Sequence, residues 1–291
     1  MLCMHGFTSW YQVFAALPLL LLAMDYLMLH KRCIPYIVAL AYCIYVNLYL
    51  ALYICIFLII RFFIYHFTDF KDFVFKGLRF AGCSILSALN SFFIISNTLL
   101  SSWDSGYRIE DSIFPSPGLH GSFFSQWKQH MIFSRVRAVN WNEDYVNLYI
   151  GIGAFLLIFV FCLSKKIKLY HKMRTLIPIA IMYISFNGRL ISFIWNGFHY
   201  QSGVPNRYAF LYMLLIALLS YDALIAIKDF SLLHFGIISG ICLIFFVCCQ
   251  FIGLGNSTFA FVSTLIVILV YFIAFLICSL KFGKRHITRA F

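Results

Sequence analysis

Residues 257–280 read STFAFVSTLIVILVYFIAFLICSL, a stretch without a single charged side chain. About 20 uncharged apolar residues are enough for a helix to cross the hydrocarbon core of a bilayer. The whole chain agrees with this stretch, because 63% of its 291 residues are hydrophobic, only 11% are charged and the mean hydropathy is +0.91. A soluble domain is about half apolar and about a quarter charged. The sequence therefore predicts an all-α, polytopic membrane protein that lies in the lipid bilayer.

Comparable apolar runs occupy most of the chain and predict one transmembrane domain over residues 1–291, a helical bundle with eight or nine membrane segments. The run 34–65 is too long for one helix, since at 1.5 Å per residue it would measure about 48 Å against a bilayer core of about 30 Å. We expect a break near Asn47, with a short hairpin or re-entrant helix over 34–46. The expected membrane segments are 9–29, 34–46, 48–66, 80–100, 145–163, 175–195, 206–227, 232–252 and 257–280, with a charged connector over 68–79 and a large loop over 101–144.

Lysine and arginine residues gather in five of the segments that join the apolar runs. Segments 29–33, 61–79, 164–174, 228–232 and 281–291 hold 2, 4, 5, 1 and 4 of them, which is 16 of the 22 in the chain. Cytoplasmic loops are enriched in these residues, so the five segments are predicted to be cytoplasmic. This topology places the N-terminus and the loop 101–144 outside and the C-terminus inside. It also places Asp25, Arg61 and Asp222 near cytoplasmic helix ends, where we expect structural roles.

Several function classes are disfavoured by what the sequence lacks. The net charge of +12 does not indicate a nucleic-acid partner, because the basic residues lie between apolar runs and form no basic face. Most of the ten cysteines lie inside apolar runs, and no C-x-x-C pair or Cys/His metal spacing occurs. The motifs of ATP hydrolysis, serine esterases and zinc proteases are absent. The sequence predicts no metal site and identifies no cofactor, although a divalent cation held by loop carboxylates is left open.

The most polar interruption between two apolar runs is WNGFHYQSGVPN, residues 195–206, which Arg189 and Arg207 flank. Irregular backbone at membrane depth is tolerated only where it is buried in protein or lines a cavity. Two guanidinium groups beside such a segment could hold a phosphate bidentately. The alternative is that Arg207 anchors the chain at the membrane interface together with Tyr208. The predicted binding residues are Arg189, Trp195, Asn196, His199, Asn206, Arg207 and Tyr208.

Catalytic candidates are weaker than these binding candidates. His199 could act as an acid, a base or a hydrogen-bond donor, or it could simply satisfy a polar turn. The loop 101–144 carries the carboxylates Asp104, Glu110 and Asp111, which suit general-base work or a divalent cation. Charged loop residues are more often only solvated, so the catalytic assignment stays open among these four residues.

Residues 195–212, WNGFHYQSGVPNRYAFLY, resemble the bacterial YfhO-type membrane proteins, a family among the GT-C-type glycosyltransferases. That family shows Trp-His-Gly-Phe, then Pro and an Arg-aromatic-x-Phe-Leu run that opens the next helix. Asn196 stands where the family usually has His. Weaker similarities are Asn47-Leu48-Tyr49 and Asn147-Leu148-Tyr149-Ile150-Gly151, in family order. The matching positions are Trp195, Gly197, Phe198, Pro205, Arg207, Tyr208, Phe210 and Leu211.

The resemblance implies a GT-C-like fold and transfer of a sugar from a polyprenyl-phosphate-linked donor. The acceptor would be a cell-envelope polymer, such as one like teichoic acid, on the external face of the bacterial cell membrane. The family carries an acidic residue on a first large external loop, for which this chain shows no counterpart, so we expect an internal fragment of a longer protein. A non-enzymatic transporter or flippase and a fragment without activity are the alternatives.

Overall fold

The computed structural model describes residues 8–104, 118–119, 123–133, 148–198, 206–227, 230–251 and 257–286. Within these ranges the chain is helical, and the β-pairing found there is an isolated bridge between Leu119 and Gly188. The predicted all-α class is therefore confirmed. The chain forms two compact units, which are described separately. Unit 1 comprises Met1–Phe114 and Phe193–Tyr200, and unit 2 comprises Pro115–Ser192 and Gln201–Phe291.

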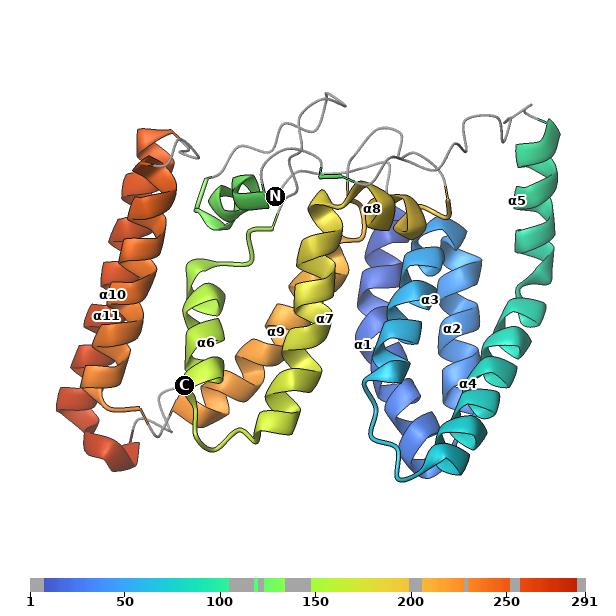
Figure 1. The fold of residues 1–291 in the computed structure, drawn as a ribbon, viewed down its shortest axis with the longest axis horizontal. Coiled ribbons are helices and arrows are strands. Elements are labelled where there is room, and N and C mark those ends of the chain that lie inside the picture. The colour runs from blue at the N-terminus through green and yellow to red at the C-terminus, as the bar shows by residue number, and fades with distance from the viewer. Residues whose placement is uncertain are drawn as a thin grey trace. The chain divides into compact units, whose positions relative to one another are not determined.

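Unit 1 is built around a central helix, α2, that packs against α1, α3 and α4 (Figure 1). Large side chains fill the space between these helices, and among them Leu20, Tyr36, Tyr53 and Phe57 are completely buried. In a membrane, close van der Waals packing of such side chains, together with hydrogen bonds between helices, stabilises the association of neighbouring helices. The helices are α1 (Thr8–His30), α2 (Ile34–Val46), α3 (Leu48–Phe63), α4 (Phe70–Asn90) and α5 (Phe92–Asp104).

The predicted break near Asn47 is confirmed. Asn47 has an extended backbone, with φ −158° and ψ 99°, between α2 and α3. Its Oδ1 accepts a hydrogen bond from the backbone N of Leu50 at 2.9 Å and so caps α3. Asn at this position stops one helix and starts the next, which divides the long apolar run into two short helices.

The expected connector 68–79 is wrong, because α4 begins at Phe70 within it. Asp69 caps the helix by accepting from the backbone N of Asp72 at 2.7 Å. Asp72 then pairs with Lys76 one turn later, at 2.7 Å. These charged residues form the first turns of a helix and not a loop, so α4 starts ten residues before the expected segment 80–100.

A second departure from the prediction lies inside that segment. Helices α4 and α5 are separated by Ser91 and meet at an angle of 68°. The Ser91 hydroxyl donates to the carbonyl oxygen of Ala41 on α2 at 3.0 Å, which ties the bend to the neighbouring helix. The segment is thus a bent pair of helices, as Figure 1 shows.

The charged residues Asp25 and Arg61 are paired with each other, as expected of residues with structural roles. Arg61 on α3 lies 3.3 Å from the carboxylate of Asp25 on α1. The hydroxyl of Tyr65 also donates to Asp25. Together these contacts join the last turns of α1 and α3.

Unit 2 has α6 in contact with α9, α10 and α11 around one apolar core, and α7 packs on α9 (Figure 1). Val160, Leu219, Ile238 and Ile268 are fully buried in this core. The expected segment 175–195 is divided at Gly188 into two helices, the first of which starts earlier, at Leu169. The elements are η2, a 3-10 helix (Phe123–His130), α6 (Ile152–Leu163), α7 (Leu169–Asn187), α8 (Arg189–Trp195, shared with unit 1), α9 (Ala209–Ala226), α10 (Leu232–Cys249) and α11 (Thr258–His286).

Four helices among the described residues are long and apolar enough to cross a membrane, or five if the bent pair 70–101 counts as one span. The four are Trp10–His30, Ala209–Ala226, Leu232–Cys249 and Thr258–Ile277. The apolar helices α2, α3 and α6 are shorter than a full span. The expected count of eight or nine segments, the single domain over 1–291 and the GT-C-like arrangement stay predictions.

Candidate functional site

The predicted binding segment is divided between the two units. Trp195 and Asn196 belong to unit 1, whereas Arg189, Asn206, Arg207 and Tyr208 belong to unit 2. The catalytic candidates are not placed: Asp104 is described only as the last residue of α5, without its side chain, and His199, Glu110 and Asp111 lie outside the described residues.

In unit 1, Asn196 joins two segments that are far apart in the sequence. The hydroxyl of Tyr53 donates to Asn196 Oδ1 at 2.8 Å, and that of Tyr49 donates to the same atom at 3.2 Å. Tyr53 is completely buried, Asn196 is 5% exposed, and the two tyrosine rings meet edge to face with centroids 5.0 Å apart. Buried polar groups are costly unless they are bonded, so this arrangement holds the end of α8 in one position against α3.

The residues on either side of Asn196 have steric roles. Trp195 is 1% exposed and is the largest fully buried side chain among the described residues. Gly197 has φ +70°, a backbone conformation that side chains disfavour, and a Cβ added there would lie 2.9 Å from Leu52 Cδ2, so the leucine side chain would have to shift. The backbone N of Phe198 donates to the carbonyl oxygen of Phe193 at 2.9 Å and closes the helix end. The Trp-Asn-Gly-Phe sequence is therefore a helix-ending turn anchored to α3.

In unit 2, the turn that opens α9 is bonded to the end of α7. The Tyr208 hydroxyl lies 2.9 Å from the carbonyl oxygen of Ser185 and 2.9 Å from Asn206 Oδ1. Asn206 has a left-handed backbone, with φ 51°, and its Nδ2 donates to the carbonyl oxygen of Phe186 at 3.3 Å. The rings of Phe186 and Tyr208 stack with centroids 5.4 Å apart. Tyr208 is fully buried, so it is a structural anchor here and not an interfacial residue exposed to lipid headgroups.

The two arginines sit at this end of unit 2 with different exposure. Arg189 begins α8 with an exposed side chain, and its backbone N donates to the carbonyl oxygen of Gly118 at 3.0 Å. Arg207 is half-buried between Asn206 and Tyr208. A clamp in which both guanidinium groups hold one phosphate stays a prediction.

Sequence reasoning missed a set of polar residues in η2. Gln126 is completely buried and its Nε2 donates to Asn187 Oδ1, at the end of α7, at 2.8 Å. His130 Nε2 lies 3.1 Å from the hydroxyl of Tyr212 on α9. The only signal in the sequence was the cluster of Gln and His residues among the aromatic residues of the loop 101–144. The structure shows that η2 inserts polar side chains between helix ends.

Burial also changes the acid–base behaviour of this cluster. The pKa of His130 is lowered from its ordinary value of 6.5 to about 4, because burial disfavours the charged imidazolium. His130 is therefore neutral at physiological pH. Gln126 Oε1 is also buried, and it has no hydrogen-bond partner among the described residues. No three His, Cys, Asp or Glu side chains in the described ranges lie close enough together to hold a metal ion.

These features define the class as a multi-pass α-helical membrane protein with clusters of buried polar residues at the ends of α7 and α8. The family model described as bacterial membrane protein YfhO matches residues 2–291, nearly the whole chain. The chain therefore belongs to the YfhO family, as the resemblance of residues 195–212 predicted, and it is a protein of the bacterial cell membrane. No match was found among curated proteins or among solved structures.

Proposed function

We propose that this YfhO-family protein is a membrane glycosyltransferase of the GT-C type. It transfers a sugar from a polyprenyl-phosphate-linked donor to a cell-envelope polymer on the external face of the membrane. The observation that carries this proposal is the bonding of Asn196 to Tyr49 and Tyr53. Asn196 and Tyr49 belong to two of the three segments that resemble the family, and Tyr53 lies one helical turn after Tyr49. The three side chains meet in a buried polar cluster, although 147 residues separate Tyr49 from Asn196 and 143 separate Tyr53 from it.

In this proposal, the topology places the N-terminus outside and the C-terminus in the cytoplasm. The end of α7 and the start of α9 then lie on the external side, where a polyprenyl-phosphate headgroup would be reached from the membrane. The third similar segment also ends in a specific backbone feature, since Gly151 opens α6 with φ +97°. A GT-C-like bundle of eight or nine segments is consistent with this topology.

The reaction would need little more than positioning and charge. An acceptor hydroxyl attacks the anomeric carbon of the donor, the bond between that carbon and the phosphate oxygen breaks, and polyprenyl phosphate leaves. Arg207 and Arg189 would stabilise the negative charge on the departing phosphate. The proton of the acceptor would pass to a carboxylate, for which Asp104, Glu110 and Asp111 are the candidates, or to His199. Trp195, Asn196, Asn206 and Tyr208 would hold the binding segment in place.

The test is sugar transfer by the purified full chain in proteoliposomes that contain a radiolabelled polyprenyl-phosphate sugar and a teichoic-acid acceptor. The variant Arg207→Ala should lower the rate roughly 10- to 100-fold, the effect of losing one charge-assisted contact. Arg174→Ala is the matched control, because Arg174 is also half-buried in unit 2 but lies near the opposite end of α7.

Equal transfer by the Arg207→Ala variant and the wild type would remove Arg207 from the mechanism. Movement of the labelled lipid across the bilayer without covalent change would instead indicate a transporter or flippase. A preparation that is folded but does neither would support a fragment without activity.

A further inference from the structure

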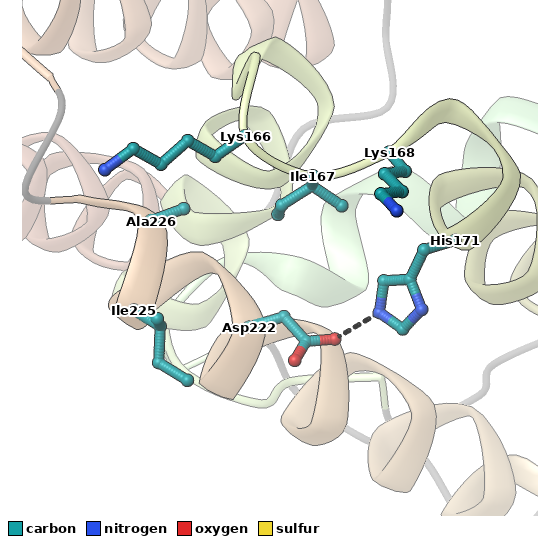
Figure 2. Close-up of a pocket in the computed structure, with 7 residues that line it drawn as sticks. All are labelled: Lys166, Ile167, Lys168, His171, Asp222, Ile225 and Ala226. Carbon is teal, nitrogen blue, oxygen red and sulfur yellow. Dashed lines mark hydrogen bonds and ion pairs between the residues drawn. The ribbon is translucent and has the colours of Figure 1, made fainter.

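A pocket of about 540 Å³ lies in unit 2 at the turn between α6 and α7. Figure 2 shows the seven residues that line it, four from the turn and the start of α7 and three from the last turns of α9. Neither the family resemblance nor the proposed site included this region. The lining residues are Lys166, Ile167, Lys168, His171, Asp222, Ile225 and Ala226.

The polar part of this pocket carries a positive charge. His171 Nε2 lies 2.8 Å from Asp222 Oδ2, so the single carboxylate of the lining has a partner within the pocket (Figure 2). Two lysines against one aspartate give the lining a net charge of +1, with the histidine counted as neutral. The amino group of Lys168 points toward His171 in Figure 2. An anion would be attracted to this side of the pocket.

The turn itself is held in shape by a lysine outside the lining. Lys172 Nζ donates to the carbonyl oxygen of Cys162 at 2.6 Å and so ties the first turn of α7 to the last turn of α6. The first turn of α7 contains no acidic residue. The positively charged wall of the pocket is therefore a built part of the turn between two packed helices.

The apolar residues of the lining indicate what kind of molecule carries the anionic group. Ile167, Ile225 and Ala226 are apolar, and the last two belong to the end of Ala209–Ala226, a helix long and apolar enough to span a membrane. The end of such a helix lies at the depth of the lipid headgroups. Basic pockets at that depth, with apolar residues beside them, suit anionic lipid headgroups.

We propose that the pocket between the α6–α7 turn and the end of α9 binds the phosphate of an anionic phospholipid. Lys168 holds the phosphate beside the His171–Asp222 pair, Lys166 adds positive charge on the other side of the pocket (Figure 2), and Ile167 and Ile225 contact the glycerol and upper acyl chain. The site lies at the opposite end of α7 from Asn187, and it does not depend on the proposed sugar transfer.

Binding is measured by native mass spectrometry of the full chain released from detergent micelles, with short-chain phosphatidylglycerol as the probe. Phosphatidylcholine, a zwitterionic lipid, and inorganic phosphate are the comparison probes. We expect retention of phosphatidylglycerol, much weaker retention of phosphatidylcholine, and no displacement by inorganic phosphate at equal concentration. Displacement by inorganic phosphate would overturn the assignment to a lipid.

The double variant Lys166→Gln, Lys168→Gln should lower the affinity for phosphatidylglycerol roughly 10- to 30-fold, because each of the two lysines contributes a similar share of the attraction to an anionic lipid. Lys165→Gln is the matched control, because Lys165 is exposed in the same turn but does not line the pocket. The variant Asp222→Asn should raise the affinity by removing the one negative charge of the lining. Unchanged affinity in both the double lysine variant and Asp222→Asn would overturn the proposal.

Discussion

The two ends of α7 hold their polar residues in opposite ways. At the Asn187 end, Gln126, Asn187 and Tyr208 are buried, neutral and bonded to one another or to backbone. At the Leu169 end, Lys166, Lys168 and His171 are exposed, and the two lysines are charged. Removing one partner of a buried hydrogen bond leaves the other partner unsatisfied and costs stability, whereas an exposed ion pair contributes at most about 1 kcal/mol to the free energy of unfolding. The first end is thus suited to positioning a segment of chain, and the second to attracting a ligand.

The largest expected effect is at the buried end. Asn187→Leu leaves the amide of Gln126 buried without its partner, which should lower the free energy of unfolding by about 1–3 kcal/mol. Thermal unfolding of the purified protein in detergent measures the change. The double variant with Gln126→Met removes both partners and should recover part of the loss. A double variant that is less stable than Asn187→Leu would contradict the buried pairing.

Tyr208→Phe should have a somewhat smaller effect at the same end. The change removes the hydroxyl next to the Ser185 carbonyl and the Asn206 side chain but keeps the ring stacked on Phe186. The expected loss of stability is about 1–2 kcal/mol. Tyr221→Phe is the matched control, because Tyr221 lies on α9, the helix that Tyr208 precedes, and is 66% exposed. Equal melting temperatures for the two variants would show that the Tyr208 hydroxyl holds nothing in place.

Acid should weaken the buried end through His130, whose folded-state pKa is lowered to about 4 by burial. Below its ordinary pKa of 6.5, the unfolded chain takes up a proton that the folded protein does not accept until about pH 4. Stability should therefore fall as the pH drops from 6.5 to 4 and should not depend on His130 above 6.5. Melting temperatures across this window should vary less in His130→Gln. His66→Gln, at an exposed histidine of unit 1, should follow the wild type.

The smallest effect on stability is expected at the exposed end. The side chains of His171 and Asp222 are 51% and 34% exposed, so solvent screens their interaction. Asp222→Asn should change the free energy of unfolding by less than about 1 kcal/mol, although it should strengthen phosphatidylglycerol binding. A loss of stability as large as that of Asn187→Leu would show that the two ends do not differ in the way described.

Part of the fold followed from residue patterns that act locally. Chain length against bilayer thickness required a break in the run 34–65, and Asn47 supplies it because its side chain caps the next helix. The start of α4 was missed because charged residues were read as a loop. These charged residues in fact favour the start of a helix, because Asp69 caps α4 and Asp72 pairs with Lys76 one turn later. Hydropathy indicates which residues can lie in the lipid core, but it does not indicate at which residue a helix begins.

The family site could be recognised from the sequence but not assembled from it. Trp195, Gly197 and Phe198 belong to a recognisable motif, in which Asn196 departs from the family, and Asn47-Leu48-Tyr49 is a weaker similarity. That Tyr49 and Tyr53 donate to Asn196 could not be predicted, because a hydrogen bond between residues more than 140 positions apart depends on how α3 and α8 pack. The burial of Gln126 and His130 was missed for the same reason, since a loop composition carries no information on which helix ends it covers.

The residue order alone was enough for the membrane class, the all-helical fold and the membership of the YfhO family. The first two follow because charge and unpaired backbone groups are costly in lipid. Each stretch of about 20 residues that crosses the membrane must therefore be apolar and must pair its own backbone groups. The third rests on one short motif and the match over residues 2–291. Tertiary packing was needed to separate the buried network around Asn187 from the open, charged pocket around Lys168. The sequence shows that the residues around Lys168 are basic and that Asn187 and Gln126 are neutral amides. Only the neighbours supplied by the fold decide which of these polar groups are enclosed and which are left open to a ligand.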